Sequence, residues 1–297
     1  MLAAGVVVLG TALLAWHPWK HPTLAQSTTV LPAIAAAPAG HDDVLAIIYS
    51  GDGGWRDLDQ QLGKHLQARG IPVLGVSALT YYWHGGSAAQ SARDLDALID
   101  AWLPRWHKRR VWLIGFSFGA DVLPTIVDGL GPAQRAEVTQ LVLLSPTRDL
   151  NFEIELEGYM HENWFSTRLK AITQRINPVP HFDALPPLLA LHGRPPVACY
   201  YGTEESDDTI CARTDLPAWV HVHAVPGDHH MGGDYAALAA RLIADLPADP
   251  PAGPSASRAP AAGTPAANPL APVPAASAPA TGASVASPAG TRPPRQP

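Results

Sequence analysis

A serine between glycines is the first residue of this chain whose position suggests chemistry. The motif Gly-Phe-Ser-Phe-Gly at 115–119 follows the apolar run 111–114 and precedes a segment of helical character, 120–127. A strand, a tight turn and a helix in this order present a serine as a nucleophile, and the small glycines let strand and helix pack closely around it. We therefore predict that Ser117 is an acyl-accepting nucleophile. The alternative is a tight turn whose serine only caps the helix.

A serine nucleophile needs a histidine base and an acid that orients this base. Two histidines stand in the loop 226–231, before the predicted closing helix. His230, which precedes the apolar Met231, is the preferred base, and His229 is the alternative. Paired histidines can also bind a metal, but no Asp, Glu or His set at ligand spacing accompanies them. We predict neither a metal nor a cofactor.

The acid is expected in the turn 202–208, which follows a predicted strand and contains four carboxylates. Glu205, three residues after Gly202, is the preferred partner of the histidine. Asp207 is the second candidate, because aspartate is the more common acid in such sites, and Asp208 stays open as well.

The oxyanion of the reaction needs backbone N–H groups rather than particular side chains. Phe118, directly after the nucleophile, would supply one of them. The glycine-rich loop 51–54 would supply the second, from Asp52 or Gly53. This loop lacks the Gly-Lys-Ser/Thr ending of a phosphate-binding loop.

The elements that must position these residues alternate along the chain. Apolar runs predict strands, and apolar residues at helical spacing predict helices. The strands are 43–49, 71–77, 111–114, 140–145, 197–201 and 218–225, and the helices are 56–69, 88–103, 120–127 and 235–246. The alternation predicts a mostly parallel sheet with helices on both faces. With the order serine, acid, histidine, the expected class is the α/β-hydrolase fold, and the segment 146–195 is either a cap over the site or a peripheral excursion.

Composition sets the limits of the domain and of its partners. The 297 residues have a net charge of −6, so no whole-chain basic field attracts nucleic acid. Residues 1–25 contain an apolar run typical of a signal peptide or an uncleaved N-terminal anchor, and both would place the rest in the periplasm. Residues 26–42 are expected to be a linker, 43–247 the hydrolase domain, and 248–297 a disordered Pro/Ala-rich tail.

Two cysteines, Cys199 and Cys211, flank the predicted acid turn. In an exported chain a pair of cysteines suggests one disulfide, which would hold that turn in place. Two unrelated thiols are the alternative.

Several strings in order give the chain a family resemblance. They are Gly-Asp-Gly-Gly-Trp-Arg-Asp at 51–57, Gly-Val-Ser-Ala-Leu at 75–79, the serine motif extended to Pro124, Phe-Glu-Ile at 152–154, the segment from Tyr201 to Cys211, and Pro-Gly-Asp-His-His at 226–230. Together they resemble the bacterial virulence protein family VirJ/AcvB. The resemblance implies a periplasmic α/β-hydrolase that releases lysine from lysyl-phosphatidylglycerol and is linked to virulence and type IV secretion. It implies Ser117 as the nucleophile and the histidine pair as the source of the base.

Three functions follow as hypotheses. The first is a serine hydrolase that acts on an aminoacylated phospholipid at a membrane surface, with Asp52, Asp121 or Glu155 attracting the lysyl ammonium. The second is a general esterase or thioesterase. The third is a non-catalytic protein that binds type IV secretion components.

Overall fold

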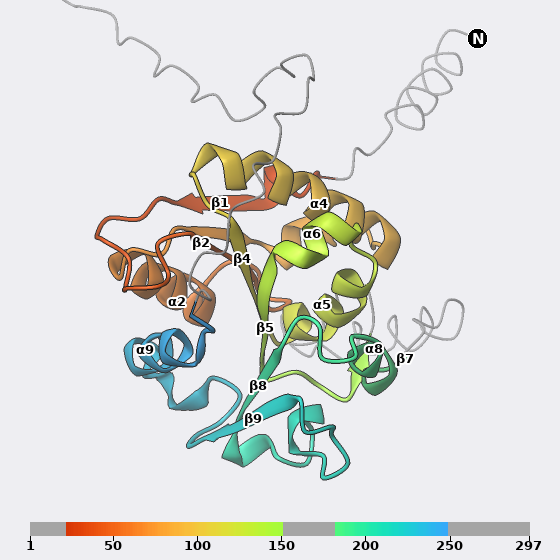
Figure 1. Ribbon diagram of the computed structural model, residues 1–297. Helices are drawn as coiled ribbons and strands as arrows, with labels where there is room; N and C mark the ends of the chain where they lie inside the picture. The colour runs from red at the N-terminus through yellow and green to blue at the C-terminus, as the bar shows by residue number, and fades with distance from the viewer. Residues whose placement is uncertain (1–21, 151–181, 249–297) are drawn as a thin grey trace, which may run out of the picture. The chain divides into compact units, whose positions relative to one another are not determined.

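The computed structural model describes residues 22–150 and 182–248 (Figure 1). They belong to the first of two compact units, 1–251, and the second unit, 252–297, lies outside the described residues. Nearly all of the predicted leader and tail also lies outside them. Of the predicted leader the structure describes residues 22–25, where Leu24 is buried, and of the predicted tail it describes residue 248.

A seven-stranded sheet forms the centre of the described residues. Its order is β1-β3-β2-β4-β5-β8-β9, and every neighbouring pair is parallel except β1 and β3. The strands are β1 (Thr28–Leu31), β2 (Val44–Tyr49), β3 (Val73–Val76), β4 (Arg110–Phe116), β5 (Val138–Leu144), β8 (Val197–Gly202) and β9 (Val220–Val225). The continuous apolar runs are explained by burial, because every residue of β2 and β3 is buried. The predicted, mostly parallel α/β-hydrolase fold is confirmed.

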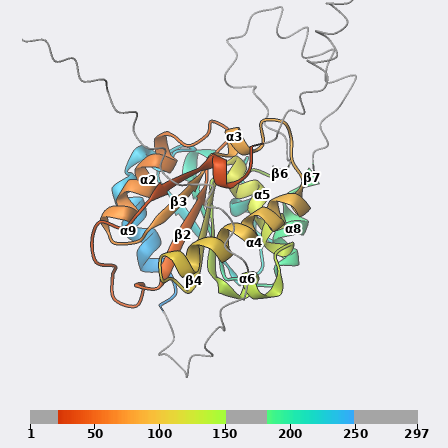
Figure 2. The ribbon, with the colours of Figure 1, turned by 90° about the horizontal axis from the view of Figure 1, so that it is seen from above.

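Helices cover both faces of this sheet (Figures 1 and 2). One face carries α2 (Asp57–Ala68) and α9 (Tyr235–Asp245), which pack on each other. The other carries α4 (Ala88–Arg105), α5 (Phe118–Asp128), α6 (Pro132–Glu137) and α8 (Leu185–Ala190), and a short α3 (Ala78–Tyr81) follows β3. No helix in the described ranges is long and apolar enough to cross a membrane.

The predicted linker 26–42 is partly wrong. Residues 28–31 form β1, which pairs antiparallel with β3 and makes one edge of the sheet. The short helix η1 (Ala25–Ser27) precedes it, and Ser27 is buried. The folded domain therefore begins before residue 43.

Most of the predicted cap or excursion, 146–195, lies outside the described residues. Its described ends form β6 (Asp149–Leu150) and β7 (Phe182–Asp183), which pair antiparallel apart from the main sheet. The helix α8 follows and packs on α5. The two ends of the segment thus meet beside α5.

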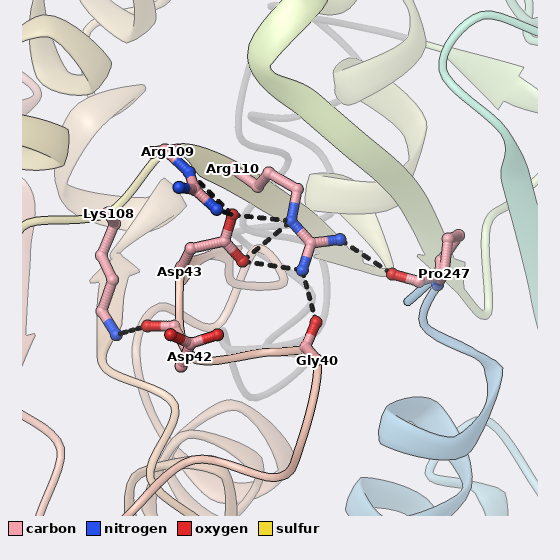
Figure 3. Close-up of polar contacts among 7 residues, drawn as sticks. All are labelled: Gly40, Asp42, Asp43, Lys108, Arg109, Arg110 and Pro247. Atoms are coloured by element: carbon pink, nitrogen blue, oxygen red, sulfur yellow. Dashed lines mark hydrogen bonds and ion pairs between the residues drawn. The ribbon is translucent and has the colours of Figure 1, made fainter. Parts of the chain in front are cut away.

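A buried carboxylate, Asp43, organises the amino end of the sheet (Figure 3). Arg110 at the start of β4 donates to Asp43 with Nη2 at 2.7 Å and Nε at 3.0 Å, and Arg109 donates with Nη2 at 3.1 Å. Arg110 also donates to the carbonyls of Gly40 and Pro247, at 2.6 and 2.9 Å. One guanidinium therefore connects β4 to both boundaries of the predicted hydrolase domain.

Candidate active site

Ser117 occupies a strained turn between β4 and α5. Its backbone has φ 51° and ψ −120°, a region that residues with a side chain rarely adopt. Its N–H donates to Leu144 O of β5 at 2.9 Å, and its carbonyl accepts from Asp121 N–H at 3.0 Å. The side chain makes no capping hydrogen bond to α5. The alternative of a capping serine is therefore wrong, and the geometry is that of a nucleophile elbow.

The two glycines of the motif are required by close packing. A Cβ on Gly115 would lie 2.5 Å from Gly119 O, and a Cβ on Gly119 would lie 2.4 Å from Tyr49 O. Both distances are far below normal van der Waals contact. Glycine at 115 therefore lets β4 approach the start of α5, and glycine at 119 lets α5 approach the end of β2.

The histidine that meets an acid is His229. Its Nδ1 lies 2.6 Å from Glu205 Oε2, and Glu205 Oε1 accepts from the Gly202 N–H at 3.1 Å. Glu205 ends the short helix η3 (Thr203–Glu205), which directly follows β8. A Cβ on Gly202 would lie 1.9 Å from Asp228 O, so glycine is needed there to bring the acid turn and the histidine loop together.

This contact shifts the ionisation of both partners. Burial opposes charge on Glu205, but hydrogen bonds from His229 and the Gly202 N–H outweigh it and hold the pKa of this carboxyl below its ordinary value. Burial also disfavours the charged form of His229, yet the hydrogen bond and charge of Glu205 raise the pKa of the imidazole. The pair thus combines an ionised acid with a strengthened base.

The other predicted members take different positions. His230 Nδ1 lies 3.3 Å from the Tyr235 hydroxyl, and the backbone N–H of His230 donates to Asp228 Oδ1 at 2.9 Å. Asp207 and Asp208 are exposed on the acid turn. Among the described residues it is Glu205 and His229 that pair, which corrects the preference for His230 over His229. Both imidazoles flank Phe116, the residue before the serine, with ring centroids 5.2 and 5.5 Å away.

A cavity of about 110 Å³ lies over the serine. It is lined by the loop 51–54, by Arg56, Asp57 and Asp59 at the start of α2, by Phe116 and Ser117, and by His229 and His230. The loop lies next to the elbow, because a Cβ added to Gly51 would come into van der Waals contact with Ser117 Cβ, at 3.5 Å. Phe118 begins α5, so its N–H has no partner within the helix. The residues predicted for the oxyanion, Asp52, Gly53 and Phe118, thus lie beside the serine.

The predicted disulfide is confirmed between Cys199 on β8 and Cys211 in η4 (Ile210–Ala212). Both cysteines are buried, and the acid turn with Glu205 lies between them. The bond therefore closes the segment that presents the acid.

Three residues of this region were absent from the predicted site or had another role. Ser145, after β5, donates from Oγ to His229 O at 2.9 Å and fixes the histidine loop. Asp121 was considered for an ammonium group, but its two oxygens accept from Thr147 N–H and Oγ1 at 2.7 and 2.9 Å. Asp59 lines the cavity as a buried carboxyl. The burial of Asp59 could have been predicted from the sequence, because Asp59 lies on the same face of α2 as the apolar Leu62 and Leu66.

The described residues contain no group of three or more His, Cys, Asp or Glu side chains arranged to hold a metal. Glu155, the third candidate for attracting an ammonium group, lies outside them.

Solved structures with a related architecture include several α/β-hydrolases. XC6422 from Xanthomonas campestris, described as an α/β serine hydrolase without lid, is 18% identical, with 75% of this chain and 90% of that chain covered and a TM-score of 0.46. Est1E from Butyrivibrio proteoclasticus is 12% identical, with 72% and 90% covered and a TM-score of 0.46. The Pyrococcus furiosus esterase Pf2001 is 17% identical, with 68% and 79% covered and the same TM-score. At this level of similarity they say nothing of what this chain acts on.

A search of curated proteins found no match to the chain. A comparison of the sequence with protein-family models is more informative. Residues 43–249, well over half of the chain, match the family model described as bacterial virulence protein (VirJ). The resemblance stated from the motifs is thereby confirmed, and the chain belongs to the VirJ family of bacterial virulence proteins.

Proposed function

We propose that the protein is a serine hydrolase that cleaves an acyl ester through Ser117, His229 and Glu205. The observation that carries the proposal is the 2.6 Å contact between His229 Nδ1 and Glu205 Oε2, because His229 lines the same cavity as Ser117. With Nδ1 held by the acid, Nε2 is the nitrogen that serves the serine. The strained turn at Ser117 supports the same role.

The reaction has two steps. Ser117 Oγ attacks the carbonyl carbon of the ester while His229 Nε2 takes the hydroxyl proton, and His229 then returns that proton to the departing alcohol. Water then attacks the carbonyl carbon of the acyl-serine and gives a proton to His229 Nε2. His229 passes this proton to Ser117 Oγ as the acyl–serine bond breaks, so the carboxylic acid leaves and the free serine is restored. The negative charge on the carbonyl oxygen is stabilised by N–H groups of Phe118 and of the Asp52–Gly53 segment.

For the substrate we propose an aminoacyl ester of a phospholipid, with lysyl-phosphatidylglycerol as the specific candidate. Membership of the VirJ family supports this choice. The reaction would take place at the membrane surface of the periplasm, and its products would be lysine and phosphatidylglycerol.

Labelling with a fluorophosphonate probe tests the nucleophile. Wild-type protein is expected to be labelled and Ser117→Ala unlabelled, while Ser206→Ala, a change at an exposed serine of the acid turn, is labelled like the wild type. An unlabelled wild type would favour a non-catalytic binding role, and equal labelling of Ser117→Ala would show that Ser117 is not the nucleophile.

Lysine release from vesicles tests the substrate. Vesicles containing lysyl-phosphatidylglycerol are expected to yield free lysine with wild-type protein and none with Ser117→Ala. In a strain that makes this lipid, deletion of the gene should raise its level, and the wild-type gene but not Ser117→Ala should restore it. An active probe-labelled protein that leaves the lipid intact would instead be a general esterase or thioesterase.

A further inference from the structure

Asp59 is a buried carboxyl with one oxygen that its surroundings do not satisfy. It stands in the first turn of α2 with 2% of its surface exposed. Its Oδ1 is inaccessible to water and accepts no hydrogen bond from any of the described residues. Buried side-chain oxygens nearly always have a partner. Asp59 also lines the cavity above Ser117, so a molecule bound there lies next to this incompletely satisfied carboxyl.

The charged residues around Asp59 indicate whether the cavity favours a positively or a negatively charged group. Asp52 and Asp57 line the same cavity, while Arg56 lies 3.5 Å from Asp57 in an ion pair. Tyr235 at the start of α9 lies close enough to interact electrostatically with Asp57, Asp59 and Asp228, and the two histidines line the cavity as well. The carboxylates outnumber the arginine, so the cavity favours a cation over an anion.

The protonation of Asp59 fits a site that awaits a cation. Burial raises the pKa of this carboxyl well above its ordinary value, Asp57 adds to the shift, and hydrogen bonds from the Gly51 and Arg56 backbone oppose it without outweighing it. An ammonium group within hydrogen-bond distance would favour the ionised carboxylate. Binding of a cation should therefore release a proton.

We propose that Asp59 binds the ammonium group of the substrate's acyl part and so selects amino-substituted acyl groups. This inference rests on the proposed hydrolase function, because it uses the cavity next to Ser117. The cavity measures about 110 Å³. Typical ligand pockets hold about 300 Å³ or more, so this one fits a short aminoacyl group and not a lipid tail.

Binding to Ser117→Ala protein tests the inference without any turnover. Four amides serve as probes: lysinamide with two ammonium groups, norleucinamide with the α group alone, ε-aminocaproamide with the terminal group alone, and caproamide with none. Calorimetry in two buffers of different ionisation enthalpy measures affinity and proton release together. We expect an ammonium-bearing amide to bind about 30-fold more tightly than caproamide, with release of a proton.

The double variant Ser117→Ala/Asp59→Asn should lose both the affinity difference and the proton release. Asp59→Asn keeps the shape of the side chain, and thermal unfolding verifies that the variant is folded. If caproamide binds as well as the amines, or if the difference survives in Asp59→Asn, the inference is overturned.

Hydrolysis provides the second test. Asp59→Asn should lower kcat/KM for the amino-substituted ester by about 30-fold and leave the caproyl ester within about twofold of the wild type. The control is Asp57→Asn, which removes a charge from the same cavity at a side chain that is 69% exposed. This control should change the preference by less than about twofold, because exposed charges are screened by water.

The outcomes separate the two proposals. If Asp59→Asn weakens all esters equally, Asp59 only positions the glycine-rich loop. If Asp57→Asn acts as strongly as Asp59→Asn, the preference comes from a diffuse field. Either result overturns the subsite. If wild-type protein cleaves no ester of the series, the hydrolase proposal fails, and the amide affinities still decide whether Asp59 binds an ammonium group.

Discussion

Asp43 and Asp59 are two similarly buried aspartates at opposite ends of the sheet, one before β2 and one after it. Two arginines bond the carboxylate of Asp43 (Figure 3), and although burial disfavours its charge, Arg110 and Arg109 hold its pKa below the ordinary value. Asp59 has an oxygen without any partner among the described residues, and burial raises its pKa. The same side chain is thus satisfied at one end of the sheet and unsatisfied at the other.

This difference agrees with a general property of parallel α/β sheets, in which ligands bind beyond the carboxyl ends of the strands and not at the amino ends. The amino end contains a complete set of ion pairs, which hold the domain together. The carboxyl end contains strained backbone at Ser117, a coupled Glu205–His229 pair and the unsatisfied Asp59. Substitutions at the two ends should therefore affect different measurements.

The largest effect is expected for His229→Ala, which should lower kcat/KM by about 10⁵-fold because it removes the base. The matched variant His230→Ala removes the neighbouring imidazole, which bonds Tyr235 rather than an acid. It should cost less than about tenfold. Kinetics of both variants on one ester decide between the two histidines, and a larger loss for His230→Ala would reverse the assignment.

Glu205→Gln should lower kcat by about 10⁴-fold, because the orienting acid loses its charge. The base must be neutral to accept a proton, so activity rises with pH through the pKa of His229. Since Glu205 raises that pKa, the rising limb should lie above about pH 6.5 in the wild type and move to lower pH in the variant. Asp207→Asn, a change at an exposed acid of the same turn, should leave the profile in place.

At the amino end, Arg110→Met should lower the free energy of unfolding by about 3 to 5 kcal/mol, because it leaves a buried carboxylate without its main partner. The Arg110 side chain is 13% exposed and that of Arg109 is 61% exposed. Arg109→Met should therefore cost less than about 1 kcal/mol. Denaturant unfolding measures both, and folded Arg110→Met should keep the wild-type kcat.

The same ion pairs predict acid sensitivity. The folded-state pKa of Asp43 lies below its unfolded value, so its contribution is complete above the ordinary carboxyl pKa and is lost as the pH falls toward the folded value. Below about pH 4 the stability gap between wild type and Arg110→Met should narrow. A gap that stays constant as the pH falls below about 4 would contradict this prediction.

The double variant Cys199→Ser/Cys211→Ser should lower the free energy of unfolding by about 3 kcal/mol, the value for a loop closed over 12 residues. Kinetics should show a loss of kcat as well, because the loop carries Glu205. If the double variant keeps the thermal stability of the wild type and its mobility in a non-reducing gel, the disulfide is excluded.

The smallest effect is expected at Asp59. Asp59→Leu should change the free energy of unfolding by less than about 1 kcal/mol, because the gain from removing an unsatisfied oxygen is offset by the loss of the hydrogen bonds from the Gly51 and Arg56 backbone. Asp43→Leu, the same change at the other end, should destabilise the protein because it leaves the nearly buried Arg110 without its carboxylate partner. If both aspartates respond alike in denaturant unfolding, the contrast between the two ends fails.

Most elements of the fold could be predicted from the sequence, because buried parallel strands and amphipathic helices have strong patterns. The strand β1 could not, since its residues are only partly buried and it relies on pairing with β3. Ser117 and Glu205 were predicted from motif and spacing, and the structure pairs Glu205 with a histidine of the predicted loop. The choice of His229 was not, because it depends on how Gly202 and Ser145 place the histidine loop, and these contacts join segments distant in the sequence.

The bonds from Arg110 to Gly40 and Pro247 have a practical consequence for protein engineering. They bring positions more than 200 residues apart to one guanidinium at the amino end of β4, whereas Ser117 lies beyond its carboxyl end. A tag or surface attached at residue 248 would start from the end of the sheet opposite to the serine and leave the cavity open to substrate.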